Sequence, residues 1–164
     1  MKRQLAALCA LALTVAGCET IPKETVFEKS KMFSAPKDIV WEKVIQYFAE
    51  RNIPIKTIEK ASGIVYAERT LSFNQYNRAD TSYIASVADC GSGGPLAPTL
   101  AHSIDMNVFV RSTGTDSTSV TVNARFHETR RVVTNGGWAT DTISVECLST
   151  GKLEADIFGA IDSK

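Results

Sequence analysis

The fold is decided by residues 103–126, SIDMNVFVRSTGTDSTSVTVNARF, where two alternating segments flank a short polar turn. Apolar side chains recur at every second position of both segments: Ile104, Met106, Val108 and Val110, then Val120, Val122, Ala124 and Phe126. A period of two places such side chains on one face of a strand. Gly114 and Asp116, between the segments, are typical turn residues. The pattern therefore predicts a long antiparallel hairpin with one apolar face.

Shorter segments on both sides of this hairpin predict further strands. They are residues 26–33, 55–60, 64–69, 83–88 and 140–148. The Asn-Gly-Gly sequence at residues 135–137 is a strong hairpin signal before the last of them. In that last strand we expect Ile143, Val145 and Cys147 to face inward.

Two further segments have the period of an amphipathic helix. The apolar positions of residues 37–52 lie on one helical face: Trp41, Val44, Ile45 and Phe48. Ser34 is the expected N-cap with Pro36 in the first turn, and Asn52 suits a left-handed backbone at the end. The second helix follows residues 149–151, and its apolar stripe is Leu153, Ile157 and Ile161.

The order of these elements is strand, helix, a run of mostly hairpin-linked strands, and helix. Runs of strands beside segregated helices define the α+β class. We expect an antiparallel sheet with one apolar face, packed by two helices in a single domain over residues 26–164. The length of 164 residues suits one domain.

The charge balance excludes one class of partner. The chain holds 18 Lys and Arg against 18 Asp and Glu, so its formal net charge is zero. Nucleic-acid binding needs a basic surface, so we expect no nucleic-acid partner.

The N-terminal sequence MKRQLAALCALALTVAGC, residues 1–18, has the features of an export signal. Lys2 and Arg3 precede an apolar stretch, residues 5–16, that is too short to span a bilayer as a helix. Val-Ala-Gly-Cys follows at residues 15–18. This sequence resembles the lipobox of bacterial lipoproteins, which has an aliphatic residue, two small residues and an invariant Cys. The alternative is an ordinary secretory signal that ends near a cysteine.

The resemblance implies that residues 1–17 are a signal peptide, removed after a diacylglyceryl group is attached to the Cys18 thiol. Residues 18–25 then form the acylated Cys and a short tether, and the lipid holds the protein at the membrane. An Asp after the acylated Cys retains enterobacterial lipoproteins in the inner membrane. Because Glu19 stands there, the resemblance favours the outer membrane, with the domain facing the periplasm.

Two cysteines remain for pairing after export. Cys9 leaves with the signal peptide and Cys18 carries the lipid, so Cys90 and Cys147 are left in an oxidising compartment. We expect them to form a disulfide, which stabilises a loop of this length by about 4 kcal/mol. Two unpaired buried thiols are the alternative.

A basic patch follows the central hairpin. Arg125 and His127 share a strand face, and Arg130 and Arg131 come next. These four residues are candidates for holding an anionic ligand or an acidic partner, because Arg suits bidentate contacts with carboxylate and phosphate. A solvated strand face is the alternative.

No catalytic constellation is recognisable in the sequence. His127-Glu128 begins like a zinc-protease motif, but the second His is missing and the segment has a strand pattern. No Gly-x-Ser-x-Gly elbow occurs. We therefore expect no metal site, no cofactor and no enzymatic activity.

The mature domain looks like the helix-grip type found in BamC-like accessory lipoproteins of the outer membrane. The similarity lies in the order of elements and in residues 40–44 (VWEKV), 61–65 (ASGIV) and 149–154 (STGKLE). We expect a binding or structural accessory subunit of an envelope assembly, with other envelope proteins as partners. The alternative is a binder of a small hydrophobic ligand or lipid in a cavity between helix 37–52 and the sheet.

Replacing the cysteine of the lipobox tests the predicted anchor. We expect Cys18→Ser to stop lipid attachment and to leave an uncleaved precursor, because only a thiol at this position can be alkylated. Metabolic labelling with palmitate measures the attachment. Cys9→Ser is the matched control and keeps its label, whereas label persisting in Cys18→Ser would contradict the prediction.

Overall fold

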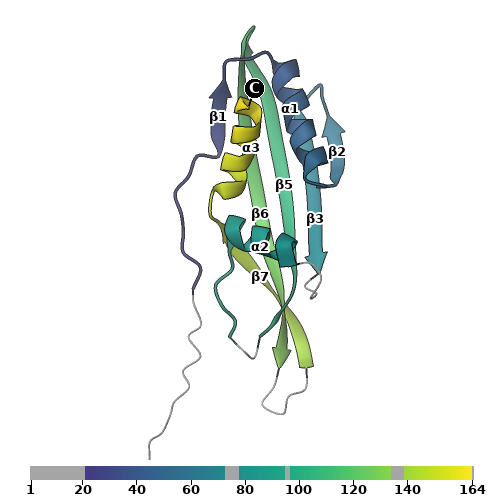
Figure 1. Ribbon diagram of the computed structural model, residues 1–164, viewed down its shortest axis with the longest axis vertical. Coiled ribbons are helices and arrows are strands. Elements are labelled where there is room, and N and C mark those ends of the chain that lie inside the picture. Colours follow the sequence, from purple (N-terminus) through teal and green to yellow (C-terminus); the bar gives the residue numbers. More distant parts are fainter. Residues whose placement is uncertain (1–20, 73–77, 95–96, 134–138, 164) are drawn as a thin grey trace, which may run out of the picture.

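The fold is built on a seven-stranded antiparallel sheet that carries its helices on one face (Figure 1). The structure, a computed structural model, describes residues 21–72, 78–94, 97–133 and 139–163. The predicted signal peptide (residues 1–17), Cys18 and the turn at residues 135–137 lie outside the described residues. The antiparallel sheet, the mixture of strands and helices and the single domain agree with the predicted fold class.

The central hairpin of the sheet is the predicted one. The strands are β1 Ser30–Phe33, β2 Ile55–Glu59, β3 Ile64–Ser72, β4 Ala88–Asp89, β5 Thr99–Gly114, β6 Ser117–Val133 and β7 Ala139–Ser149. Their order is β2-β3-β5-β6-β7-β4, and β1 pairs with the beginning of β6. Val108 of β5 lies opposite Val122 of β6, so the apolar positions of both strands share one face.

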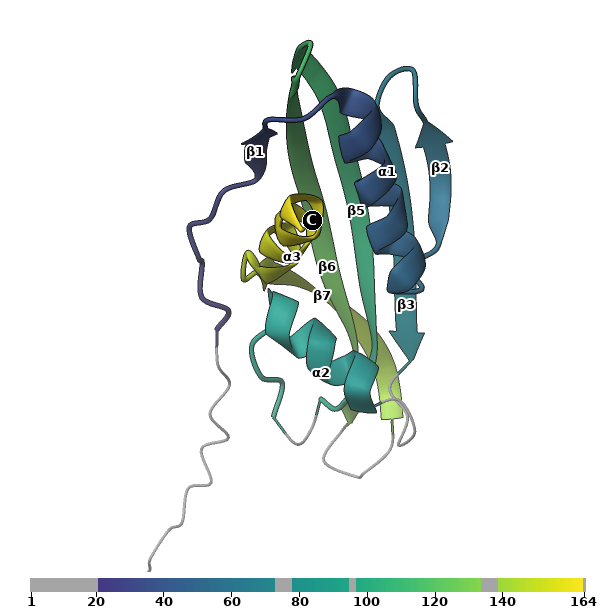
Figure 2. The ribbon, with the colours of Figure 1, turned by 45° about the horizontal axis from the view of Figure 1, so that its top comes forward.

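Two helices cover that face along its upper half. They are α1, Lys37–Glu50, and α3, Lys152–Asp162, which lie side by side against the sheet (Figure 2). The predicted N-cap is wrong: Pro36 occupies the cap position and no side chain caps the helix, because the helix begins at Lys37. Asn52 has the expected left-handed backbone, with φ 51°. No helix within the described ranges is long and apolar enough to cross a membrane.

A third helix replaces the strand predicted at residues 83–88. α2 spans Arg78–Val87, and only Ala88–Asp89 is extended, as β4. The physical reason is the spacing of the buried side chains: Ile84, Val87 and Ala88 are at most 3% exposed. Positions i, i+3 and i+4 fall on one side of a helix, whereas a strand would separate them onto two faces.

The core lies between α1, α3 and the covered face of the sheet. Several of its side chains have no exposed surface: Val44 and Phe48 from α1, Leu153 and Ile157 from α3, and Val65, Met106, Val108 and Val122 from the strands. Burying one such side chain contributes about 1.5–3 kcal/mol. This packing joins the helices to one face of the sheet, and no helix lies against the other face (Figure 1).

The inward-facing part of β7 is shorter than predicted. Cys147 is 5% exposed, but Ile143 is 43% exposed and Val145 is only partly buried. The beginning of β7 pairs with the end of β6, in a part of the sheet that α1 and α3 do not reach (Figure 1).

Gly63, in the turn between β2 and β3, is required by a close backbone approach. Its φ is +72°, and a Cβ at this position would lie 2.0 Å from the carbonyl oxygen of Val110. Gly63 also accepts a hydrogen bond from the Val110 N–H at 2.8 Å. The turn therefore joins the β2–β3 hairpin to the central hairpin through backbone atoms.

Gly63→Ala is expected to lower the free energy of unfolding by more than about 1 kcal/mol, because the side chain meets backbone at a positive φ. Gly159→Ala is the matched control. Gly159 lies inside α3 with nothing within 4 Å of its added Cβ, so this change should raise the stability by up to about 1 kcal/mol. Urea unfolding of both variants measures the difference, and equal stabilities would contradict the role of Gly63.

Candidate functional site

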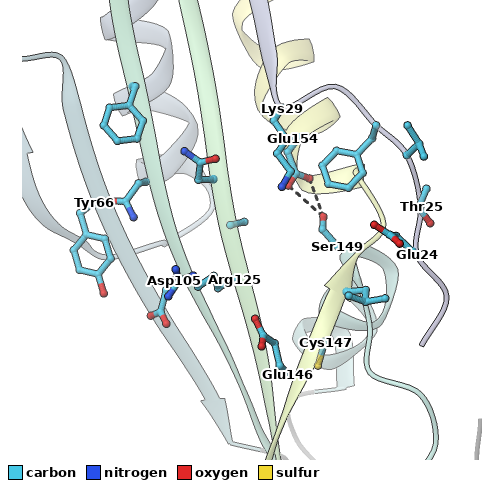
Figure 3. A pocket seen from close by; sticks show the side chains of 17 residues that line it. Glu24, Thr25, Lys29, Tyr66, Asp105, Arg125, Glu146, Cys147, Ser149 and Glu154 are labelled. Atoms are coloured by element: carbon cyan, nitrogen blue, oxygen red, sulfur yellow. Dashed lines mark hydrogen bonds between the residues drawn. The ribbon is translucent and has the colours of Figure 1, made fainter. Parts of the chain in front are cut away.

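A groove of about 930 Å³ opens on the uncovered face of the sheet (Figure 3). We call it the tether groove, because one of its walls is formed by the end of the predicted tether, residues 24–25, and by residues 26, 27 and 29 after it. Its lining residues are Glu24, Thr25, Val26, Phe27, Lys29, Tyr66, Asp105, Asn107, Phe109, Asn123, Ala124, Arg125, Glu146, Cys147, Leu148, Ser149 and Glu154. A volume of this size suits a small-molecule ligand.

The tether groove exists because β6 changes its partner at this edge. The β1 pairing ends at Thr121, and the Val122 N–H donates to the carbonyl of Lys29 at 2.8 Å. The β7 pairing begins only at Phe126. Residues 123–125 therefore have no strand beside them at this edge, and the groove passes through the break from the uncovered face to α3.

Strand register brings the polar side chains of the groove into rows. Tyr66 of β3, Asn107 of β5 and Asn123 of β6 lie opposite one another, and Asp105 lies opposite Arg125. All of these positions alternate with buried core residues, so they project from the uncovered face. Three of them, Tyr66, Asp105 and Arg125, are labelled among the lining side chains in Figure 3 and come from three neighbouring strands.

Several of these polar groups have hydrogen-bonding capacity to spare. Within the described part of the chain, the side chains of Asn107, Asn123, Arg125 and Glu146 form no hydrogen bond or ion pair. Burial, followed by the negative charges of Asp105 and Glu68, raises the pKa of Tyr66, so its phenol stays neutral. The groove thus offers donors, acceptors and charges of both signs to a ligand.

A buried carboxyl group forms the floor of the tether groove. Glu154 of α3 is 1% exposed, and it accepts hydrogen bonds from the Ser149 hydroxyl at 3.2 and 3.1 Å. Burial raises the pKa of Glu154, and the nearby charge of Lys29 opposes that rise. Glu154 stands in the first turn of α3, where a negative charge is favoured by the helix dipole.

The predicted disulfide between Cys90 and Cys147 is confirmed. It joins the residue after β4 to the end of β7, across a sequence separation of 57 residues. The bond also fixes one wall of the tether groove, because Cys147 lines it. Cys90, Cys147 and Glu128 lie close together, but the two sulfurs are bonded to each other rather than available as thiolate ligands.

The predicted basic patch is divided between the two faces of β6. Arg125, His127 and Arg131 project from the uncovered face, and Arg125 alone of them lines the tether groove. Arg130 lies on the opposite face and is 8% exposed. Neighbouring residues of a strand point to opposite sides, so Arg130 and Arg131 cannot belong to one surface.

Arg130 instead holds the segment around the disulfide. Its guanidinium donates to Glu128 at 2.8 Å and to the carbonyls of Cys90 and Gly91 at 2.6 and 3.1 Å. Thr99 donates a further hydrogen bond to Glu128. Burial acts to raise the pKa of Glu128, but the bonds from Arg130 and Thr99 outweigh it and lower that pKa. The pair is therefore charged at neutral pH.

His102 lies opposite Glu128 in the β5–β6 register. Burial lowers the pKa of His102, which keeps the imidazole neutral at neutral pH. His102, Glu154 and the tether groove were not predicted from the sequence. For Glu154 a signal existed: it stands beside Leu153 in the apolar stripe of the last helix, where a carboxylate must be buried.

In comparisons with known proteins, no family model matches the chain. No curated sequence is significantly similar to it.

The contributions of Glu154 and Glu128 to folding stability should depend on pH in opposite directions. The contribution of Glu154 is tested with Glu154→Gln. Because the pKa of Glu154 is raised in the folded state, the wild type loses stability as the pH rises from the unfolded value through the folded one. Glu154→Gln removes this loss. The variant should therefore gain stability relative to wild type from pH 4 to pH 8, measured by thermal unfolding across that range.

Glu128→Gln is the control of opposite sign. The pKa of Glu128 is lowered, so its contribution is present above the unfolded pKa and disappears in acid. At neutral pH the variant leaves Arg130 unpaired and should lose about 3–5 kcal/mol. Parallel pH profiles for the two variants would contradict the assignment of the two carboxyl groups.

Proposed function

We propose that this chain is a periplasm-facing lipoprotein, anchored in the outer membrane by lipid on Cys18, that serves as an accessory subunit of an envelope assembly. The observation that carries the proposal is the Val-Ala-Gly-Cys sequence at residues 15–18, directly after an apolar stretch of signal length. The Cys90–Cys147 disulfide is consistent with it, because such bonds persist in oxidising compartments outside the cytosol.

The domain is proposed to belong to the helix-grip type. Support comes from the antiparallel sheet and from the way α1 and α3 lie side by side across one face of it (Figure 2). In this arrangement the helices pack against one face of the sheet to form the core, and the opposite face is accessible to partners.

A binding or structural role, rather than catalysis, fits the chemistry of the tether groove. Its sulfur and one of its hydroxyl groups already have structural tasks: Cys147 is bonded to Cys90, and Ser149 donates to Glu154. The unpaired polar side chains beside them suit recognition of a polar ligand or a partner surface.

A second candidate function is the binding of a small ligand, and the volume of the tether groove favours it. This site differs from the cavity expected between helix 37–52 and the sheet. In the described structure, side chains without exposed surface, such as Val44 and Phe48 of α1 and Val65 of β3, fill that space. The ligand proposed now is polar, because the groove is.

Co-purification from native envelopes tests the accessory role. We expect the mild-detergent extract of the lipoprotein to contain envelope proteins, identified by mass spectrometry, and their recovery to fall with added salt. Charge reversal of the uncovered face, with Arg125→Glu and Arg131→Glu, should reduce recovery several-fold without changing the circular dichroism spectrum.

The matched control for this test is Lys56→Glu, which reverses an exposed charge on β2, at the far edge of the sheet. It should leave the recovery of partners unchanged. If the two β6 reversals also leave it unchanged, Arg125 and Arg131 belong to a solvated strand face and do not contact a partner.

A further inference from the structure

The tether groove is held close to the point where the chain would enter the membrane, an argument that rests on the proposed lipid anchor. The Lys23 N–H donates to Asp89 at 2.9 Å, and the Gly91 N–H donates to the same carboxylate at 2.9 Å. Asp89 precedes Cys90 of the disulfide. This contact fixes the beginning of the groove wall to the body of the domain.

The length of chain before the groove wall limits its distance from the bilayer. Glu24, the first lining residue, is six residues after Cys18. Six extended residues span at most about 22 Å. With the proposed anchor in place, the groove therefore lies within reach of lipid headgroups at the membrane surface.

The charges of the groove disfavour ligands of a single sign. Lys29 and Arg125 supply two cations, and Glu24, Asp105 and Glu146 supply carboxylates, with the buried carboxyl group of Glu154 beneath them. A simple anion would meet the carboxylates, and a simple cation would meet Lys29 and Arg125. A ligand that carries both signs satisfies both sets, and Arg125 and Glu146 have no partner of their own among the described residues.

We propose that the tether groove binds a zwitterion with a phosphate and a primary ammonium group, supplied by phosphatidylethanolamine of the leaflet that holds the anchor. Arg125 donates two parallel hydrogen bonds to phosphate oxygens, and Lys29 adds a point charge. The three N–H donors of the ammonium group reach Asp105 and Glu146. The amide of Asn123 serves the ester oxygens.

The first test uses phosphorylethanolamine as a soluble probe. The mature chain, residues 18–164 with Cys18→Ser, is labelled with ¹⁵N and titrated while amide shifts are followed by NMR. We expect saturable shifts grouped at Asn107, residues 123–125 and Glu146. Glycerol phosphate, which lacks the ammonium group, and ethanolamine, which lacks the phosphate, should each bind at least about tenfold more weakly.

Two results of this titration would overturn the proposal. The first is an absence of saturable shifts up to the solubility of the probe. The second is equal binding of glycerol phosphate, which would make the groove a plain anion site. Neither result depends on acylation of the protein. If the groove does not bind the probe, the proposed lipid anchor is therefore still tested separately by palmitate labelling.

A matched pair of variants tests the residues. Arg125→Gln should weaken binding of phosphorylethanolamine about tenfold or more, because one charge-assisted contact is lost. Arg131→Gln removes the same charge from the same face of β6, six residues further on and outside the groove, and should bind like the wild type. Equal affinities of the two variants would overturn the assignment of Arg125.

The last test asks whether the headgroup is met in a bilayer. The acylated protein is placed in nanodiscs of phosphatidylcholine with or without phosphatidylethanolamine, and hydrogen exchange of residues 123–125 is measured. Slower exchange with phosphatidylethanolamine supports the proposal. Equal exchange in both discs would overturn the membrane as the source of the ligand.

Discussion

The disulfide between Cys90 and Cys147 is the constraint that holds together β4, the end of β7 and the segments packed against them. It holds the short β4 against the end of β7, where the sheet would otherwise have an open edge. Arg130 can then reach the carbonyls of Cys90 and Gly91, and Asp89 can receive the Lys23 N–H. One covalent bond thus places the buried ion pair, the end of the predicted tether and a wall of the groove.

The side chains on the covered face of β6 change from apolar to charged toward the end of the strand. Val120, Val122 and Phe126 lie under α1 and α3, and their packing is apolar. Beyond them the same face carries Glu128 and Arg130, which a core accepts only when each charge is paired. The carbonyls of Cys90 and Gly91, beside the disulfide, accept two further hydrogen bonds from Arg130, so the disulfide helps to hold the polar end of the face in place.

The local sequence pattern was enough to predict the central hairpin, α1 and α3, because the apolar residues of each recur with the period of a strand or a helix. The disulfide followed by elimination, because the predicted export signal left only two cysteines to pair. The pattern failed at Tyr83–Ala88, which was assigned to a strand. The spacing of Ile84, Val87 and Ala88 fits one face of a helix better than one face of a strand. The pattern also grouped Arg130 with Arg131, although the parity of a strand separates neighbours. The tether groove could not be predicted, since its walls come from segments about 120 residues apart in the chain.

The pKa values of the two buried carboxyl groups, Glu128 and Glu154, are shifted in opposite directions because their neighbours differ. Glu128 has a guanidinium in contact, so its pKa is lowered and it remains charged. At Glu154 burial outweighs the hydrogen bonds from its own backbone N–H and from the Ser149 hydroxyl and the charge of Lys29, so its pKa is raised. The floor of the groove is therefore a carboxyl group whose charged form burial disfavours. The carboxylate of Glu128 is instead held in its ion pair with Arg130, which also binds the carbonyls of the disulfide segment.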